Sequence, residues 1–132
     1  MREIKFRGWN DVYKDWVVGH LTTWRNNDNT IDYQIKMGHE NCSVTRTVMA
    51  ESVGQYTGLN DKNGVEIYEG DILQVDDPED NSTCIVVFHE GAFCKNFGLF
   101  DGEPLITSLD VYELEIWKVI GNVVRGGRNE KD

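Results

Sequence analysis

Apolar and polar residues alternate in short windows near the start of the chain, which is the periodicity of a β-strand with one buried face. In the stretch EIKFRGW, Ile4 and Phe6 fall on one parity and the charged residues fall on the other. A later stretch, IDYQIKM, alternates in the same way, and two others are rich in the β-branched and aromatic residues that favour strands. Strands are therefore predicted at residues 3–9, 16–24, 31–37 and 42–50.

Residues 57–73, TGLNDKNGVEIYEGDIL, combine turn signals with alternating apolar residues. The dipeptide Asn63-Gly64 adopts positive φ at low cost and so favours a tight hairpin turn. Gly70 is typical of a second turn or bulge, after which residues 72–75 begin another strand. We interpret the stretch as a fold-determining hairpin rather than as a catalytic loop or a ligand cradle. Turn positions are assigned to Gly58, Gly64 and Gly70.

The second half of the chain continues the series of short strands. TCIVVFHE, residues 83–90, is the most strand-like window, and residues 117–124 form a final strand. The glycine-rich segment at residues 91–104 is predicted to be irregular. A short helix or turn is expected near residues 109–114, and the tail at residues 125–132 is expected to fray.

Many short strands separated by turns at about every 8 to 12 residues are typical of an all-β fold. The prediction is a mainly β protein, a small barrel-like or sandwich-like domain with at most one short helix. Residues 1–132 are expected to form one domain. Two β subdomains, at about residues 1–52 and 53–124, are an alternative division.

The charge balance argues against nucleic-acid and membrane partners. The 132 residues carry a formal net charge of -10, with a pI near 4.6. Duplexes and anionic membranes would repel the chain on average. The most basic segment, the first 25 residues, has five basic and three acidic residues, which is too weak a surplus for a nucleic-acid footprint. Direct nucleic-acid binding and membrane association are therefore not expected.

The cysteines and the N-terminus indicate a cytoplasmic protein. Three cysteines, without a tandem Cys-x-x-Cys, fit a reducing compartment. The stretch MREIKFRGW lacks the apolar core of a signal peptide. No apolar run approaches the roughly 20 residues that span a bilayer.

Acidic residues concentrate in the middle of the chain. Residues 61–80 hold eight acids and one lysine, and Glu66, Glu69 and Asp71 cluster just after the Asn-Gly turn. Paired carboxylates can act as acid and base or bind a hard cation. The stretch does not fit the pattern of a calcium-binding loop, however, because the apolar residues Val65 and Ile67 fall inside it. We favour hydrated carboxylates that protect strand edges, with Asp71 binding main-chain amides of its turn.

Other chemically active side chains give no recognisable site. The spacing of Cys84, His89 and Cys94 is not a zinc pattern, and on one strand Cys84 and His89 would face opposite sides. We expect Cys84 to be a small buried residue and His89 a polar residue at a strand end. His20 and His39 are expected to be structural or exposed.

The tryptophans are interpreted as packing residues, in preference to a platform for stacking bases or sugars. They are Trp9, Trp16, Trp24 and Trp117. No catalytic residue, cofactor or metal is assigned.

Three blocks of the chain resemble the YopX-like family of bacteriophage and prophage proteins. They are REIKFRGWN at residues 2–10, VGQYTGLNDKNGVEIYEGDIL at residues 53–73, and WKVIGNVV at residues 117–124. The central block is the most specific. The resemblance implies a β-rich fold and a phage or prophage origin, and self-association is suspected for some members of the family, but it brings no catalytic residue.

Three hypotheses about function follow. The first is a non-enzymatic accessory protein that binds itself, or a host or phage protein, through strand edges and aromatic patches. The second is an acidic decoy that occupies the nucleic-acid groove of a host enzyme. The third is an enzyme that uses the carboxylates of Glu66, Glu69 or Asp71.

Overall fold

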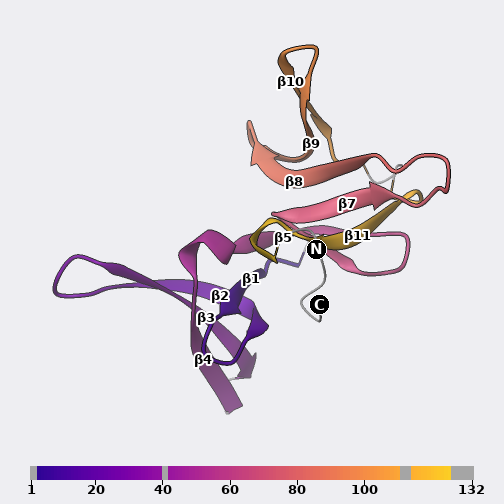
Figure 1. Ribbon diagram of the computed structural model, residues 1–132. Coiled ribbons are helices and arrows are strands. Elements are labelled where there is room, and N and C mark those ends of the chain that lie inside the picture. Colours follow the sequence, from indigo (N-terminus) through magenta and orange to yellow (C-terminus); the bar gives the residue numbers. More distant parts are fainter. Residues whose placement is uncertain (1–2, 40–41, 111–113, 126–132) are drawn as a thin grey trace. The chain divides into compact units, whose positions relative to one another are not determined.

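The computed structural model describes residues 3–39, 42–110 and 114–125 (Figure 1). The fold is mainly β with antiparallel sheets, as predicted, and no sheet closes into a barrel within the described part of the chain. Its helical segments there are two three-residue 3-10 turns. The strands are β1 (Phe6–Asn10), β2 (Asp15–Arg25), β3 (Ile31–His39), β4 (Cys42–Val48), β5 (Gly54–Asn60), β6 (Glu66–Tyr68), β7 (Asp71–Val75), β8 (Thr83–His89), β9 (Ala92–Phe100), β10 (Glu103–Ser108) and β11 (Trp117–Asn122).

The chain forms two compact units, residues 1–56 and residues 57–132. In the first unit the strand order is β4-β3-β2-β1-β5. The predicted strands are all present, and the alternation of β3 places Ile35 in the core with no exposed surface. Val17 of β2 and Val48 of β4 complete this small buried cluster.

The sheet of the first unit curls so that the end of β4 reaches β1. The main-chain N–H of Met49 donates to the carbonyl oxygen of Trp9 at 2.9 Å. The side-chain amide of Asn10 donates to the carbonyl oxygen of Thr47 at 2.8 Å. Gly8 permits this approach, because a Cβ atom there would lie 2.6 Å from the Val48 side chain. The C-terminal end of β4 is therefore covered, while the rest of its outer edge is not held by β1.

The second unit contains a five-stranded antiparallel sheet of order β10-β9-β8-β7-β11. The short strand β6 returns beside the end of β5. Leu73 and Val86 bring apolar side chains from neighbouring strands into the core, and Trp117 adds the ring of the last strand. Ile67 of β6 is fully buried in the same cluster. The strands predicted at residues 72–75, 83–90 and 117–124 are confirmed, the last one ending at Asn122.

The prediction of an irregular segment at residues 91–104 is wrong, because it forms most of a β-hairpin. Strands β9 and β10 pair across a two-residue turn, with Phe100 opposite Glu103. Both turn residues, Asp101 (φ 55°) and Gly102 (φ 83°), have positive φ. This is the conformation of the type I′ turn that matches the twist of a hairpin, and Asp-Gly is one of its preferred sequences.

The turn position predicted for Gly58 is wrong, because Gly58 lies inside β5. Its φ of 86° marks a local irregularity of that strand. The helix or turn expected near residues 109–114 falls partly on residues 111–113, which lie outside the described residues, as does the tail at 126–132. No helix in the described ranges has the length and hydropathy to cross a bilayer.

Candidate functional site

The hairpin predicted around Asn63-Gly64 is present and is closed by main-chain hydrogen bonds. The N–H of Gly64 donates to the carbonyl oxygen of Asp61 at 3.0 Å, and the N–H of Asp61 donates to that of Val65 at 2.8 Å. Gly64 has a φ of 81°, the left-handed value that the sequence predicted for this position. The Asn63-Gly64 turn therefore serves to build the hairpin, as predicted.

Asp61 is the buried centre of this hairpin, with 6% of its surface exposed. Its Oδ1 atom accepts hydrogen bonds from the N–H groups of Asn63 at 2.8 Å and Val65 at 2.9 Å. Its Oδ2 atom accepts one from the N–H of Val119 on β11 at 2.9 Å. The expectation of hydrated carboxylates is wrong here. Burial is tolerated because three main-chain donors replace the water that the carboxylate loses.

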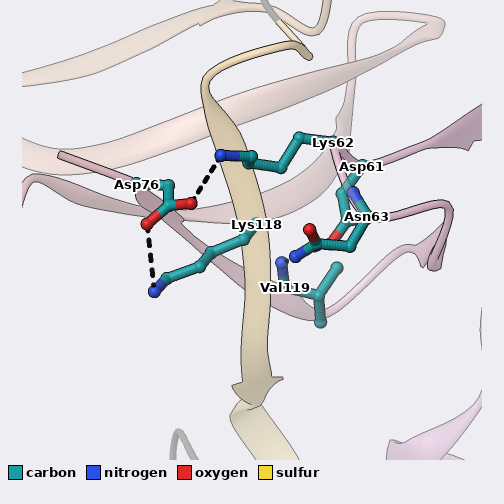
Figure 2. A network of polar contacts seen from close by, with 6 residues as sticks. All are labelled: Asp61, Lys62, Asn63, Asp76, Lys118 and Val119. Carbon is teal, nitrogen blue, oxygen red and sulfur yellow. Dashed lines mark hydrogen bonds and ion pairs between the residues drawn. The ribbon is translucent and has the colours of Figure 1, made fainter.

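Next to Asp61, a second acid joins the hairpin to β11 at the surface. Asp76 lies 2.6 Å from the ammonium group of Lys62 and 3.4 Å from that of Lys118 (Figure 2). The hydrogen bond from Lys62, followed by the charge of Lys118, lowers the pKa of Asp76 below its usual value. The main chain of Lys62 also donates to the carbonyl oxygen of Trp117 at 3.2 Å. The acidic segment thus fastens the outer edge of the last strand.

The remaining acids of residues 61–80 are also largely engaged with their own chain. Asp71 is 1% exposed, and its carboxylate accepts from the main-chain N–H of Tyr68 at 2.7 Å, as predicted. Glu66 accepts from the Tyr68 hydroxyl at 3.1 Å. Asp77 and Asp80 each accept a main-chain N–H two residues ahead. Across the described residues, no group of three or more potential metal-binding side chains converges. The acids of this segment that the structure places therefore act as hydrogen-bond acceptors within their own turns and hairpins.

The sulfur and imidazole side chains lie where their strand parity predicts. Cys84 is 3% exposed in the core, and burial raises the pKa of its thiol to about 11. His89 ends the same strand with about half of its side chain exposed. A thiol with such a pKa stays protonated near neutral pH and is a poor nucleophile. His20 is exposed, and the side chain of His39 is outside what the structure describes.

The tryptophans divide between core and surface. Trp9 and Trp117 are buried, at 4% and 5% exposure, as the packing interpretation predicts. Trp16 is half-buried and meets the Trp9 ring edge-on at a centroid distance of 5.4 Å. Trp24 differs, because 63% of its surface is exposed on β2. The rings therefore do not form one stacking platform.

Two exposed features that the sequence analysis did not single out could contact a partner. The first is the turn end of the β9–β10 hairpin, called here the β9–β10 tip and defined as residues 99–102. Leu99 is 74% exposed and Phe100 is 70% exposed. The second is the outer edge of β4, where most side chains are exposed. Large exposed apolar side chains and free strand edges are typical of protein-binding surfaces.

The net charge is distributed unequally between the two units. Residues 1–56 contain seven basic and seven acidic residues, and are neutral. Residues 57–132 contain six basic and sixteen acidic residues, and therefore carry the whole net charge of -10. A positively charged partner would therefore be attracted to the second unit. The first unit, which is neutral, does not repel the same unit of a second copy.

Comparisons with known proteins give a family model and similar solved structures. The family model described as "YopX protein" matches residues 5–125. The crystal structure of protein EF1440 from Enterococcus faecalis is 27% identical and covers 93% of this chain and 94% of its own, with a TM-score of 0.53. Protein yopX from Bacillus subtilis is 19% identical over 93% of this chain and 92% of its own, with a TM-score of 0.52, which shows the fold alone. A search among curated proteins gives no significant match.

Proposed function

This chain belongs to the YopX protein family, and from that premise we propose that it is a non-enzymatic accessory protein of phage or prophage origin. It works in the bacterial cytoplasm by binding proteins, either a host or phage protein or a second copy of itself. Support for the origin comes from the three blocks that resemble YopX-like proteins. Support for binding rather than catalysis comes from the acidic segment, whose buried carboxylates are used to build the fold.

The single observation that carries this proposal is the β9–β10 tip. Leu99 and Phe100 are neighbours in a strand, so their side chains project to opposite faces of the hairpin. Both are more than two-thirds exposed, and the two-residue turn beside them fixes the main chain. Isolated exposed apolar residues are ordinary. Two adjacent ones at the end of a hairpin form an apolar wedge of the kind that is typical of protein-binding surfaces.

A capture experiment with two matched variants tests the proposal. Immobilised wild-type protein is exposed to host lysate and to phage-infected lysate, and light scattering measures its own association. The double variant Leu99→Ser with Phe100→Ser should lose the captured partner. The variant Val12→Ser should keep it, because Val12 is 82% exposed in the other unit and serves as a control for surface polarity. A strictly monomeric protein that captures nothing from either lysate would refute the proposal.

The charge distribution favours a second candidate, an acidic decoy that occupies the nucleic-acid groove of a host enzyme. Its support is that all of the net negative charge belongs to residues 57–132. Binding to a basic enzyme should weaken steeply between low and high ionic strength, because salt screens charges at exposed surfaces. Affinity that does not change with salt would exclude the decoy and leave the apolar wedge as the binding element.

A further inference from the structure

The strands at the ends of the two sheets differ in how their outer edges are protected. The edge of β11 is covered by the hairpin loop, through Asp61 and Lys62. The edge strand β10 contains Pro104, which lacks an N–H, and a register shift follows it. The strand β6 is three residues long. Proline, bulges, shortness and covering loops all prevent strands of other chains from adding to a sheet.

Among the strands that the structure describes, β4 is the sheet end that has none of these devices along most of its length. Its sequence, CSVTRTV, contains no proline, lysine or acid, and it pairs with β3 in seven successive residue pairs without a shift. Its one charged residue, Arg46, does not guard the edge, because the guanidinium lies 4.0 Å from the centroid of the Tyr13 ring. The strand is regular, rich in β-branched residues and uncharged at Ser43, Val44 and Thr45.

The covered end of β4 shows which main-chain groups point outward. The carbonyl oxygen of Thr47 and the N–H of Met49 both bond to β1, on the side away from β3. In an antiparallel strand the N–H and C=O groups of one residue point to the same side, and that side alternates along the strand. Ser43 and Thr45 share the parity of Thr47, so their main-chain groups also face outward. The open edge is thus Cys42–Arg46.

We propose that this edge pairs antiparallel with the same edge of a second copy, with the two Val44 residues opposite each other. This inference rests on the proposed function of protein binding and names one partner and one register for it. Ser43 of each copy then faces Thr45 of the other, and each such pair exchanges two main-chain hydrogen bonds. Val44, which is 43% exposed, meets its counterpart in the closer, non-hydrogen-bonded position.

Two observations select this occupant and this register. A two-fold axis at Thr45 would require Ser43 to bond with Thr47, whose carbonyl oxygen already accepts from Asn10. An axis at Val44 uses only the open residues. A second copy also meets no net repulsion at this unit, since residues 1–56, which contain β4, carry no net charge.

Disulfide trapping tests the register. In a Cys42→Ser background, the variant Val44→Cys should form a covalent dimer on mild oxidation. Opposite Cβ atoms in a non-hydrogen-bonded pair lie at the close end of the cross-strand range of about 4.5–5.5 Å, near the separation of about 3.5–4.5 Å that a disulfide needs. The variant Ser43→Cys should form far less covalent dimer, because Ser43 of each copy lies opposite Thr45 of the other copy and not opposite the second Ser43. The two buried cysteines, Cys84 and Cys94, remain as internal controls. Equal trapping of both variants, or none of either, would overturn the proposed pairing.

A reversible measurement separates this inference from the proposed function. Sedimentation equilibrium should show that Val44→Lys weakens the wild-type dimer at least tenfold, because two lysines would face each other across the axis. The control Val18→Lys, at 37% exposure on an inner strand, should leave the dimer unchanged. If the Val44→Lys variant dimerises as tightly as the wild type, the β4 pairing is wrong, although the protein still self-associates. A wild-type monomer that still captures a lysate partner through the β9–β10 tip contradicts the pairing and keeps the proposed function.

Discussion

The carboxylate of Asp61 accepts a hydrogen bond from the main-chain N–H of Val119 at 2.9 Å, although 58 residues separate them in the chain. The same carboxylate closes its own hairpin through Asn63 and Val65. One buried side chain therefore sets a local turn and also holds the outer edge of β11. The hairpin and the last strand should lose stability together when this side chain is altered.

Replacing Asp61 by Asn should destabilise the protein by about 2–4 kcal/mol, because an amide offers one acceptor where two oxygens are needed and leaves a buried donor unsatisfied. Urea unfolding of the wild type and the variant measures the difference. Asp77→Asn is the matched control, since Asp77 is exposed and accepts one local N–H. Equal losses of unfolding free energy in the two variants would show that the buried hydrogen bonds of Asp61 contribute no more than the single exposed bond of Asp77.

The ion pairs of Asp76 should make stability depend on pH on the acid side. The pKa of Asp76 is lowered in the folded protein by Lys62 first and then by Lys118. A lowered folded pKa gives stability that is present above the unfolded pKa, near 3.8, and that is lost as the pH falls through the folded pKa. Asp76→Asn should therefore be less stable than wild type at pH 7 and equal to it at the acid end. A difference that stays constant with pH would contradict this.

The close approach of β1 and β4 should make Gly8 intolerant of a methyl group. Gly8→Ala places a Cβ atom 2.6 Å from the Val48 side chain and should cost about 1–3 kcal/mol through overpacking. Combining it with Val48→Gly, which also removes the Val48 Cβ atom that would lie 2.6 Å away, should recover part of the loss. Thermal unfolding of the two single variants and the double variant gives the coupling, expected at about 0.5–3 kcal/mol. Strict additivity would mean that the two residues do not touch.

The three thiols should react at very different rates in the native protein. Cys42 is exposed, whereas Cys84 and Cys94 are buried, and burial raises the pKa of the Cys84 thiol to about 11. A thiol reagent at pH 8 should modify Cys42 promptly and the other two only after denaturant is added. Mass spectrometry of the modified protein identifies the sites. Prompt modification of Cys84 would contradict its placement in the core.

Features that depend on neighbouring residues were predictable from the sequence. The Asn63-Gly64 turn follows from the backbone freedom of two adjacent residues. The opposite placement of Cys84 and His89 follows from the two-residue period of a strand. Asp101-Gly102 carries the same kind of turn signal, but the segment before it has no clean alternation of apolar and polar residues, so the β9–β10 hairpin was missed.

The role of Asp61 could not be read from its surroundings in the sequence. An aspartate in a stretch that also holds seven other acids looks like a solvated residue. One of its three hydrogen bonds comes from Val119, which lies 58 positions further along the chain. The open edge of β4 is hidden for a similar reason. Whether a strand lies at the end of a sheet is set by the pairing of all its neighbours, and not by its own residues.

The position of β11 gives the two units different times of completion on the ribosome. Pairing within residues 1–56 links strands that are consecutive in the sequence, apart from the closing contacts of β1, so this unit can fold as soon as it leaves the exit tunnel. The second unit must wait for Trp117, because β11 pairs with β7 and completes the apolar core. Until then the edge of β7 and its apolar neighbours stay exposed.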